Sequence, residues 1–298
     1  MNIPARIVTI FCITLLIGGG GALAQGTAGP ALPLGALPRL QGLDDARRNE
    51  LIAVLKQHQN QGACKGSIYD CLVQATPDRT AVRLANFAAF LLSKGVLAQG
   101  LDQFFSKRAE FAGAEQHTFD EANAPKYGHL NASIRLIEFG EFKCAMCAGV
   151  SPTLKNLIDD SNGVVMLSFK HFPITGHEGA VLASRAAIAA QRQGKFWEMA
   201  ELLYRNWDKT EEYEMLDLAG QLGLDMARFR ADLADPEVGN MVRNDKVEGL
   251  NAKVDATPTL FINGKRYDLR LDEAHLKDTI NAEAERLGIA PPYKDWVY

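Results

Sequence analysis

Two cysteines separated by two residues, Cys144 and Cys147, lie at the boundary between a β-favouring segment and a helical one. Residues 134–139 before the pair are rich in β-favouring apolar side chains, and residues 148–159 after it have a helical pattern. A second β-favouring run follows at 164–172. The order strand, helix, strand predicts two parallel strands joined by a right-handed crossover. The sequence therefore predicts an α/β fold around the cysteine pair.

The chain after residue 172 first turns helical and then returns to strands. Residues 178–250 predict several helices, because glycines and capping residues mark helix ends and starts. These marks are Gly194, Thr210, Gly223, Asp225 and Asp235–Pro236. Two short β-favouring runs, 259–262 and 266–269, flank Asn263–Gly264, a strong hairpin signal, and a last helix is predicted at 272–287. This order resembles a thioredoxin domain with helices inserted into its middle.

The spacing and position of Cys144 and Cys147 indicate redox chemistry. The thiolate is the nucleophilic form of cysteine, and its pKa falls at a helix N-terminus, where unpaired N–H groups favour negative charge. Cys144 is expected to attack a substrate disulfide, and Cys147, one turn deeper, to resolve the mixed disulfide. Half of a zinc site and a structural disulfide are the alternatives. Zinc needs about four ligands, and neither the other cysteines nor His171 and His177 have a standard ligand spacing, so no metal is expected.

Glu138 interrupts the apolar run six residues before Cys144. If its side chain faces inward, desolvation raises its pKa, and it can exchange protons with Cys147 as that thiol ionises. The alternative is a strand-end carboxylate that reaches solvent. Pro152, inside the helix that follows the pair, is expected to kink that helix.

Residues 1–24 have the features of an export signal. Arg6 supplies a positive start, residues 7–17 form an apolar run, and Ala22–Leu23–Ala24 gives the small-x-small pattern of a cleavage site. The run is too short for a bilayer core, which needs about 20 residues; an uncleaved membrane anchor is the alternative. We expect export to the periplasm, with no stable membrane span after cleavage. Cleavage removes Cys12 and leaves an even number of cysteines, which favours two disulfide-capable pairs.

Three further segments precede the α/β domain, which is expected at 131–298. Residues 25–42 are rich in Gly, Ala, Pro and Leu without a clear period, and predict a flexible lead-in. Residues 43–112 have helical periodicity and predict a small all-α domain, in which residues 101–105 mark a short helix. The polar, irregular residues 113–130 predict a linker.

Cys64 and Cys71, in the predicted helical domain, are too far apart for a disulfide within one continuous helix. Gly66–Ser67 offers a break, and Ser67 with Asp70 forms a near capping box that opens a helix. Cys64 can then fold back onto Cys71. A structural disulfide is the favoured interpretation, and a second redox centre that relays electrons to the main one is the alternative.

Several separated segments carry a family resemblance. They are residues 131–139 followed by Phe142–Lys143–Cys144, then Phe172–Pro173, 194–199 and 256–264. Over residues of about 130 to 290 the chain resembles the DsbA-like thiol–disulfide oxidoreductases of the thioredoxin superfamily. The resemblance implies that Pro258 is cis and faces the cysteines, and that the Thr257 backbone pairs with an extended substrate segment. A trans proline at a strand start is the alternative.

The chain departs from this family between the two cysteines. Ala145 and Met146 stand where the family commonly has a proline or a histidine, residues that help to set thiolate stability. Without a histidine donor, Cys144 is expected to be less acidic and its disulfide less oxidising. The direction of electron flow is therefore left open among oxidation, reduction and isomerisation.

The helical region carries a second resemblance, over residues 64–108. Its marks are Gly66–Ser67–Ile68, Lys94–Gly95 and residues 104–108. They are similar to the helical thiol-reductant domain of cytochrome c maturation. That family has its own CxxC, whose first position is Gln61 here, which argues against a catalytic role for this half. A docking or dimerisation surface is equally compatible with the apolar helical stripes.

The leading functional hypothesis is an exported enzyme that exchanges disulfides with protein substrates. The alternatives are a dedicated thiol reductant for one partner pathway, such as cytochrome c maturation, and a chaperone-like binding module with a structural disulfide. Expected partners are exported proteins with thiols or disulfides and an unidentified redox partner. A net charge of −4 without clustered Lys and Arg argues against nucleic-acid binding. No cofactor is expected, because the two sulfurs carry the electrons.

Overall fold

The structure is a computed structural model that describes residues 31–294 of the 298-residue chain. Internal contacts divide the chain into Met1–Leu32 and Pro33–Tyr298. The fold below is that of the second unit, and the predicted export signal lies outside the described residues. No helix within residues 31–294 combines the length and the apolar character needed to cross a bilayer.

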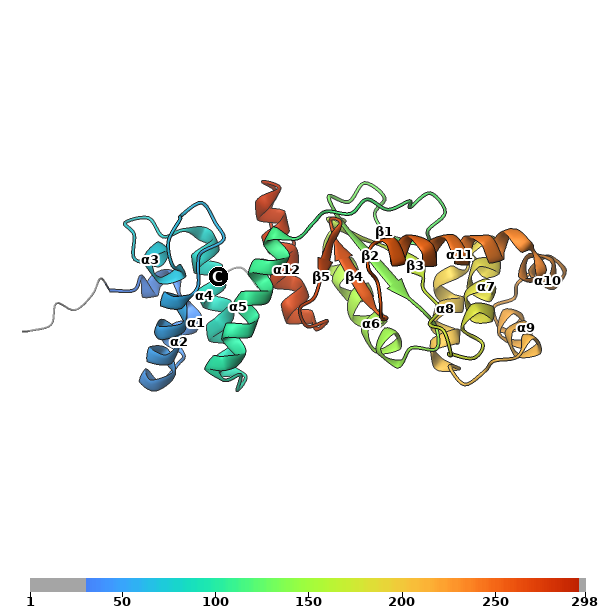
Figure 1. The fold of residues 1–298 in the computed structure, drawn as a ribbon, viewed down its shortest axis with the longest axis horizontal. Coiled ribbons are helices and arrows are strands. Elements are labelled where there is room, and N and C mark those ends of the chain that lie inside the picture. Colours follow the sequence, from blue (N-terminus) through green and yellow to red (C-terminus); the bar gives the residue numbers. More distant parts are fainter. Residues whose placement is uncertain (1–30, 295–298) are drawn as a thin grey trace, which may run out of the picture. The chain divides into compact units, whose positions relative to one another are not determined.

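A five-stranded mixed sheet forms the centre of the α/β part (Figure 1). The strands lie in the order β1-β3-β2-β4-β5. Their bounds are Lys126–Gly128 for β1, Ile134–Gly140 for β2, Val165–His171 for β3, Thr259–Ile262 for β4 and Lys265–Tyr267 for β5. β2 and β3 are parallel, and the other neighbouring pairs are antiparallel. The helix α6 (Ala145–Asp160) joins β2 to β3, as the strand–helix–strand pattern predicts.

The sheet buries both of its faces, because successive side chains of a strand point to opposite sides. Ile134 and Leu136 of β2 pack in one apolar cluster with residues of α6 and α12 (Glu273–Arg286). Ile137 and Phe139 belong to a second cluster, with Phe172 and residues that follow the end of α11. β2 is thus a buried central strand, and it delivers the chain to Cys144 at a fixed position.

Five helices stand between β3 and β4, and they confirm the thioredoxin fold with a helical insertion. They are α7 (Ala180–Gln191), α8 (Phe196–Arg205), α9 (Glu212–Gln221), α10 (Met226–Ala234) and α11 (Pro236–Asn251). Asp225 and Asp235 cap α10 and α11 as expected. The start of α9 differs from the prediction of a helix opened by Thr210. Glu211 is the N-cap, because it and Glu214 accept each other's backbone N–H groups.

A helical region precedes the sheet, as predicted. It consists of η1 (Leu34–Ala36), α1 (Pro38–Gln41), α2 (Asp45–Gln57), α3 (Ile68–Leu72), α4 (Arg79–Ser93) and α5 (Ala98–Gly113). The short helix expected at 101–105 is therefore part of a longer one. Residues 33–42 of the expected flexible lead-in are also packed, because Leu37 and Leu40 are fully buried and Asn86 donates to the Ala36 carbonyl at 3.0 Å.

Two strand assignments also differ from the sequence-based expectation. β1 lies within the irregular segment 113–130 and pairs with β3, but three residues are too few to establish a period-two pattern. β5 begins at Lys265 instead of 266, because Asn263 (φ 48°) and Gly264 (φ 79°) alone make the two-residue hairpin turn.

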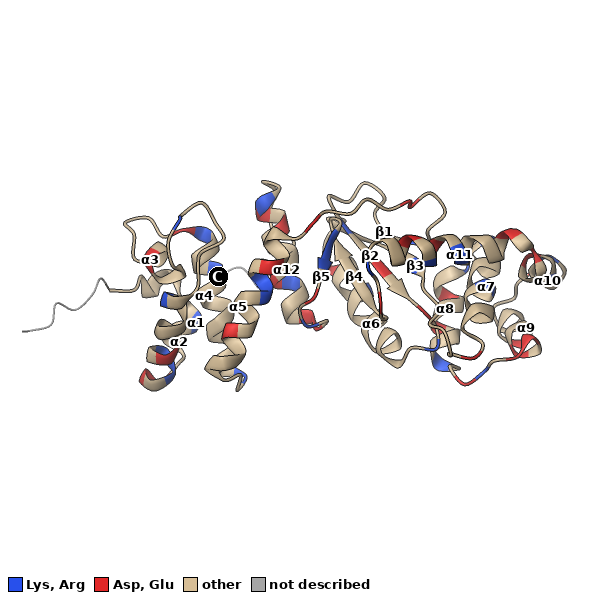
Figure 2. Ribbon diagram, viewed as in Figure 1, with Lys and Arg blue, Asp and Glu red and all other residues tan. Residues whose placement is uncertain are grey.

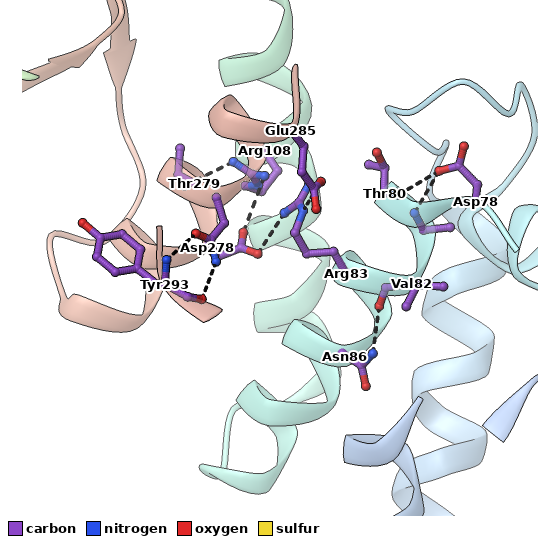
Figure 3. A network of polar contacts seen from close by, with 12 residues as sticks. Asp78, Thr80, Val82, Arg83, Asn86, Arg108, Asp278, Thr279, Glu285 and Tyr293 are labelled. Carbon is purple, nitrogen blue, oxygen red and sulfur yellow. Dashed lines mark hydrogen bonds and ion pairs between the residues drawn. The ribbon is translucent and has the colours of Figure 1, made fainter. Parts of the chain in front are cut away.

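A buried network of charges joins α4 and α5 to α12 (Figure 3). Arg83 Nη1 of α4 donates to Asp278 Oδ1 of α12 at 2.8 Å. Arg108 of α5 lies 3.5 Å from the other oxygen of Asp278 and donates to Thr279 Oγ1 at 3.1 Å. The Asp278 side chain is fully buried. Acidic and basic residues are interspersed over the helices (Figure 2). Arg83, Arg108 and Asp278 differ from most of them because they are buried.

Candidate active site

The turn from β2 into α6 places the two predicted redox cysteines in the first turn of a helix. Cys144 is the N-cap of α6 and is partly exposed, whereas Cys147 is fully buried. Cys144 Sγ accepts a hydrogen bond from the Cys147 backbone N–H at 3.2 Å. As a thiol it donates to the Thr257 carbonyl at 3.3 Å, and the Thr257–Pro258 peptide is cis. The fold therefore brings the cysteine pair and the predicted substrate-binding segment together.

The surroundings of Cys144 favour its thiolate. Its pKa is lowered to about 6, chiefly because the Cys147 side chain donates to the thiolate. Burial opposes this effect, whereas the Thr257 side chain and the backbone N–H groups of Met146 and Cys147 add to it. These donors come from the helix start and the cis-proline segment, so Cys144 is acidic without a histidine between the cysteines.

We expect the thiolate absorbance of the reduced protein near 240 nm to rise with a midpoint near pH 6, well below the value of about 8.5 for an unperturbed cysteine. Cys144→Ser should remove this titration. Cys147→Ala should move the midpoint upward, because it removes the strongest donor to the thiolate. A single midpoint above pH 8 in the native protein would contradict the described geometry.

Cys147 and Glu138 are held in their protonated forms. The pKa of the Cys147 thiol is raised by its hydrogen bond to Cys144, by burial and by the charge of Glu138. Burial, followed by the charge of Cys144, raises the pKa of Glu138 to about 8. Of the two orientations considered for Glu138, the structure has the inward one, with 2% of the residue exposed. At neutral pH the site thus holds one thiolate, a thiol and a mostly protonated carboxyl.

The space beside the Glu138 carboxyl leaves room for a group that exchanges a proton with it. Its Oε1 has no hydrogen bond among the described residues. A Cβ on Gly140 would lie 3.1 Å from this oxygen and 2.8 Å from the Phe169 ring, so glycine at 140 keeps the space beside the carboxyl open. The proton-transfer role remains a prediction, and the position of Glu138 is compatible with it.

Glu138 should also make the stability of the protein depend on pH. Between pH 4.5 and about 8 the folded state keeps a proton on Glu138 that the unfolded state releases. For this group the unfolded state binds fewer protons, so its contribution to the free energy of unfolding falls with rising pH, by up to about 1.4 kcal/mol per unit. The fall should be clearest between pH 4.5 and 6, because above pH 6 the lowered pKa of Cys144 contributes a slope of the opposite sign. Glu138→Gln should flatten this slope in denaturant titrations, whereas the exposed Glu50→Gln should preserve it. Parallel slopes for all three proteins would contradict the burial of a neutral carboxyl.

Sequence reasoning missed several residues around the pair. The Tyr204 ring of α8 lies 5.1 Å from the Phe142 ring, and the pKa of Tyr204 is raised by burial and by the charges of Glu138 and both cysteines. Lys143 donates to the Trp207 carbonyl at 2.7 Å and to that of Lys209, which attaches the α8–α9 connection beside Cys144. These partners lie far along the chain from the CxxC motif, and no local pattern marks them.

The two histidines considered as ligands have separate surroundings. His171 is buried at the end of β3, where burial lowers its pKa to about 3, and neither ring nitrogen has a hydrogen bond within residues 31–294. His177 pairs through Nδ1 with the buried carboxylate of Glu141. In the described part of the chain, no three His, Cys, Asp or Glu side chains form a group suited to a metal ion.

Cys64 and Cys71 are joined by a disulfide, away from the Cys144–Cys147 pair in the sequence. Ser67 caps α3 with the reciprocal Asp70 contact that the near capping box suggests, and this turn places the Cα atoms of the two cysteines 5.8 Å apart. Gln74 Nε2 donates to Cys64 Sγ at 3.0 Å. The break before α3 therefore makes the bridge possible.

The architecture is similar to that of known thioredoxin-like proteins. A family model described as "Thioredoxin" matches residues 120–282. A thioredoxin-like oxidoreductase from Silicibacter pomeroyi is 25% identical, with a TM-score of 0.51 over 55% of this chain and 94% of that one. BdbD from Bacillus subtilis is also 25% identical, with a TM-score of 0.51 over 58% of this chain and 98% of that one.

Curated relatives share a shorter stretch. Na(+)/H(+) antiporter NhaA 3 from Salinispora tropica is 35% identical over 141 residues, which are 47% of this chain and 22% of the relative. NhaA from Herminiimonas arsenicoxydans is 31% identical over 161 residues, or 51% of this chain and 26% of the relative. The chain thus spans about a quarter of the length of these relatives. Their names refer to the full-length proteins. With the family model covering more than half of its residues, the chain belongs to the thioredoxin family.

Proposed function

We propose that this chain is an exported thiol–disulfide oxidoreductase that exchanges disulfides with protein substrates through Cys144 and Cys147. Its enzyme class is that of an oxidoreductase, as for its structural neighbour from Silicibacter pomeroyi. The observation that carries the proposal is the asymmetry of the pair. The Cys144 thiolate is accessible at the start of α6, whereas the Cys147 thiol is buried behind it.

This asymmetry supports a two-step exchange. The Cys144 thiolate attacks one sulfur of a substrate disulfide, which forms a mixed disulfide and releases the other substrate sulfur as a thiolate. Cys147 then loses its proton and attacks Cys144 Sγ, which forms the Cys144–Cys147 disulfide and releases the second substrate sulfur. Two electrons pass to the substrate, and the reverse sequence oxidises it. Glu138 is the nearby group proposed to exchange protons with Cys147. Its unprotonated fraction accepts the Cys147 proton, and this fraction grows when the mixed disulfide removes the Cys144 charge that helps to raise the Glu138 pKa.

The cis-proline segment supports the placement of a substrate. The Thr257 carbonyl lies 3.3 Å from Cys144 Sγ, so an extended peptide paired with the Thr257 backbone would present its cysteine to the nucleophile. Exported proteins with thiols or disulfides are the proposed substrates. A separate redox partner, not identified by the fold, would return the pair to its starting state.

Trapping of mixed disulfides tests the proposal. Cys147→Ala removes the resolving thiol, so Cys144 should accumulate covalent adducts with substrate proteins, visible on non-reducing gels and removed by dithiothreitol. The control is the double variant Cys144→Ala/Cys147→Ala, which should trap nothing. Many adducts support a general oxidoreductase, and a single adduct would replace it with a dedicated reductant. Absence of adducts, together with failure to reduce a model protein disulfide, would contradict both.

Export is tested separately. We propose cleavage after Ala24 and residence in the periplasm. Sequencing the N-terminus of the mature protein from a periplasmic fraction should find Gln25 first. A protein that keeps residues 1–24 and sediments with membranes would instead show the uncleaved anchor.

A further inference from the structure

An apolar groove lies between the helical region and the start of α12, apart from the redox site. It has a volume of about 840 Å³, within the usual range for small-ligand sites. Its lining comes from the end of α4, from α5, from the connection between β5 and α12, and from the first residues of α12. None of Glu138, Cys144, Cys147, Thr257 or Pro258 lines it.

The floor of the groove is aromatic and rigidly supported. The rings of Phe104 and His275 line it, with centroids 5.9 Å apart, and Phe87 packs against both at 5.1 and 5.2 Å. The buried ion network lies one helical turn away on each helix, through Arg83, Arg108 and Asp278. The buried ion network therefore holds α4, α5 and α12 together next to the groove, and the groove is preformed.

The rim carries charges of both signs, and all but one of them are paired. Its ion pairs are Lys107–Glu110, Arg270–Asp272, Asp268–Arg266 and Glu273–Lys277. Lys94, which is exposed at the C-cap of α4, has no carboxylate partner within residues 31–294. Its Nζ lies 5.5 Å from the centroid of the Phe90 ring, which also lines the groove. Lys94 is thus a cation without a carboxylate partner among the described residues, next to the apolar floor of the groove.

We infer that this groove binds a single-chain amphipathic anion, of the chemical class of fatty carboxylates. The acyl chain would cover the apolar side chains of α4, α5 and the β5–α12 connection, including Leu91, Phe104 and Leu269. The carboxylate would pair with Lys94. The inference is independent of thiol–disulfide exchange, because the groove and the cysteine pair share no residues.

Calorimetric titration of the mature protein with dodecanoate, below its micelle concentration, tests the inference. The wild type should bind one equivalent. Lys94→Gln should weaken dodecanoate binding about five-fold, the effect of one exposed ion pair, and leave binding of neutral dodecanol unchanged. Lys65→Gln is the matched control, since Lys65 is exposed, does not line the groove and donates to the Gly62 carbonyl, with no carboxylate partner among the described residues.

A second variant tests the acyl site itself. Gln103 is an exposed residue of the lining, so Gln103→Trp should place an indole ring in the path of the acyl chain and strongly weaken binding of both ligands without a cost to the core. Gln99→Trp, an exposed position of α5 outside the lining, should bind as the wild type does. The inference is overturned if the wild type does not bind dodecanoate, or if Gln103→Trp binds it normally. It is also overturned if Gln103→Trp dissolves a dimer of the native chain, or if only vesicles of anionic phospholipid bind.

Discussion

Replacing Cys144 by serine is expected to lower the rate of disulfide exchange with a model protein substrate by about 10³-fold or more, the loss typical of removing an enzyme nucleophile. The Cys144 thiolate is populated at neutral pH, because its pKa is near 6. A serine hydroxyl at the same place stays protonated and cannot form a disulfide. The remaining Cys147 is buried and cannot replace it as the attacking group.

The expected loss is chemical and not structural. Cys144 is partly exposed and serine has nearly its shape, so the circular dichroism spectrum and the unfolding midpoint should stay close to those of the native protein. Ala231→Ser, at an exposed position of α10 away from the cysteine pair in the sequence, is the control and should keep its activity. A Cys144→Ser protein that retained more than a tenth of the exchange rate would show that another sulfur does the chemistry.

The sequence was enough to predict the order of the main elements and the position of the two cysteines at the start of α6. Buried strands have strong β-favouring runs, and the CxxC motif marks the start of α6 by itself. β1 escaped detection because only three residues pair, and Tyr204 because its nearness to the cysteines depends on how the inserted helices fold back on the sheet. The orientation of Glu138 stayed open for a related reason: a strand pattern gives alternation, but the covering layer decides whether a side chain reaches solvent.

Local sequence signals also failed for residues 25–42, where they predicted flexibility for a segment that is partly packed. Composition predicts flexibility for residues 25–42, but composition cannot show a partner surface. Leu37 and Leu40 find one on the helical region, where Asn86 of α4 also binds the Ala36 carbonyl. Contacts between segments distant in sequence therefore determine which residues are packed, and local signals do not show them. The contacts between α4, α5 and α12 are of this kind.

Removing the central carboxylate of the network in Figure 3 should have a large effect on stability. Asp278→Asn leaves two buried guanidinium groups, those of Arg83 and Arg108, without their shared counter-charge. Breaking a buried ion pair in this way costs about 3–5 kcal/mol of unfolding free energy, because the remaining charge stays desolvated. Arg83 keeps its second carboxylate, Glu285, at 3.4 Å, so we expect the lower half of this range. Urea unfolding followed by circular dichroism measures the change.

Two controls separate burial of charge from loss of a contact. Glu110→Gln breaks the exposed pair with Lys107 on α5 and should cost no more than about 0.5 kcal/mol. The triple variant Arg83→Met/Arg108→Met/Asp278→Leu removes the three buried charges and leaves only Glu285, which reaches solvent in part. It should recover most of the stability lost in Asp278→Asn, since apolar side chains of similar size need no counter-charge. If Asp278→Asn instead unfolded at the same urea concentration as Glu110→Gln, water would have to reach the network, and α4, α5 and α12 would not be held together by it.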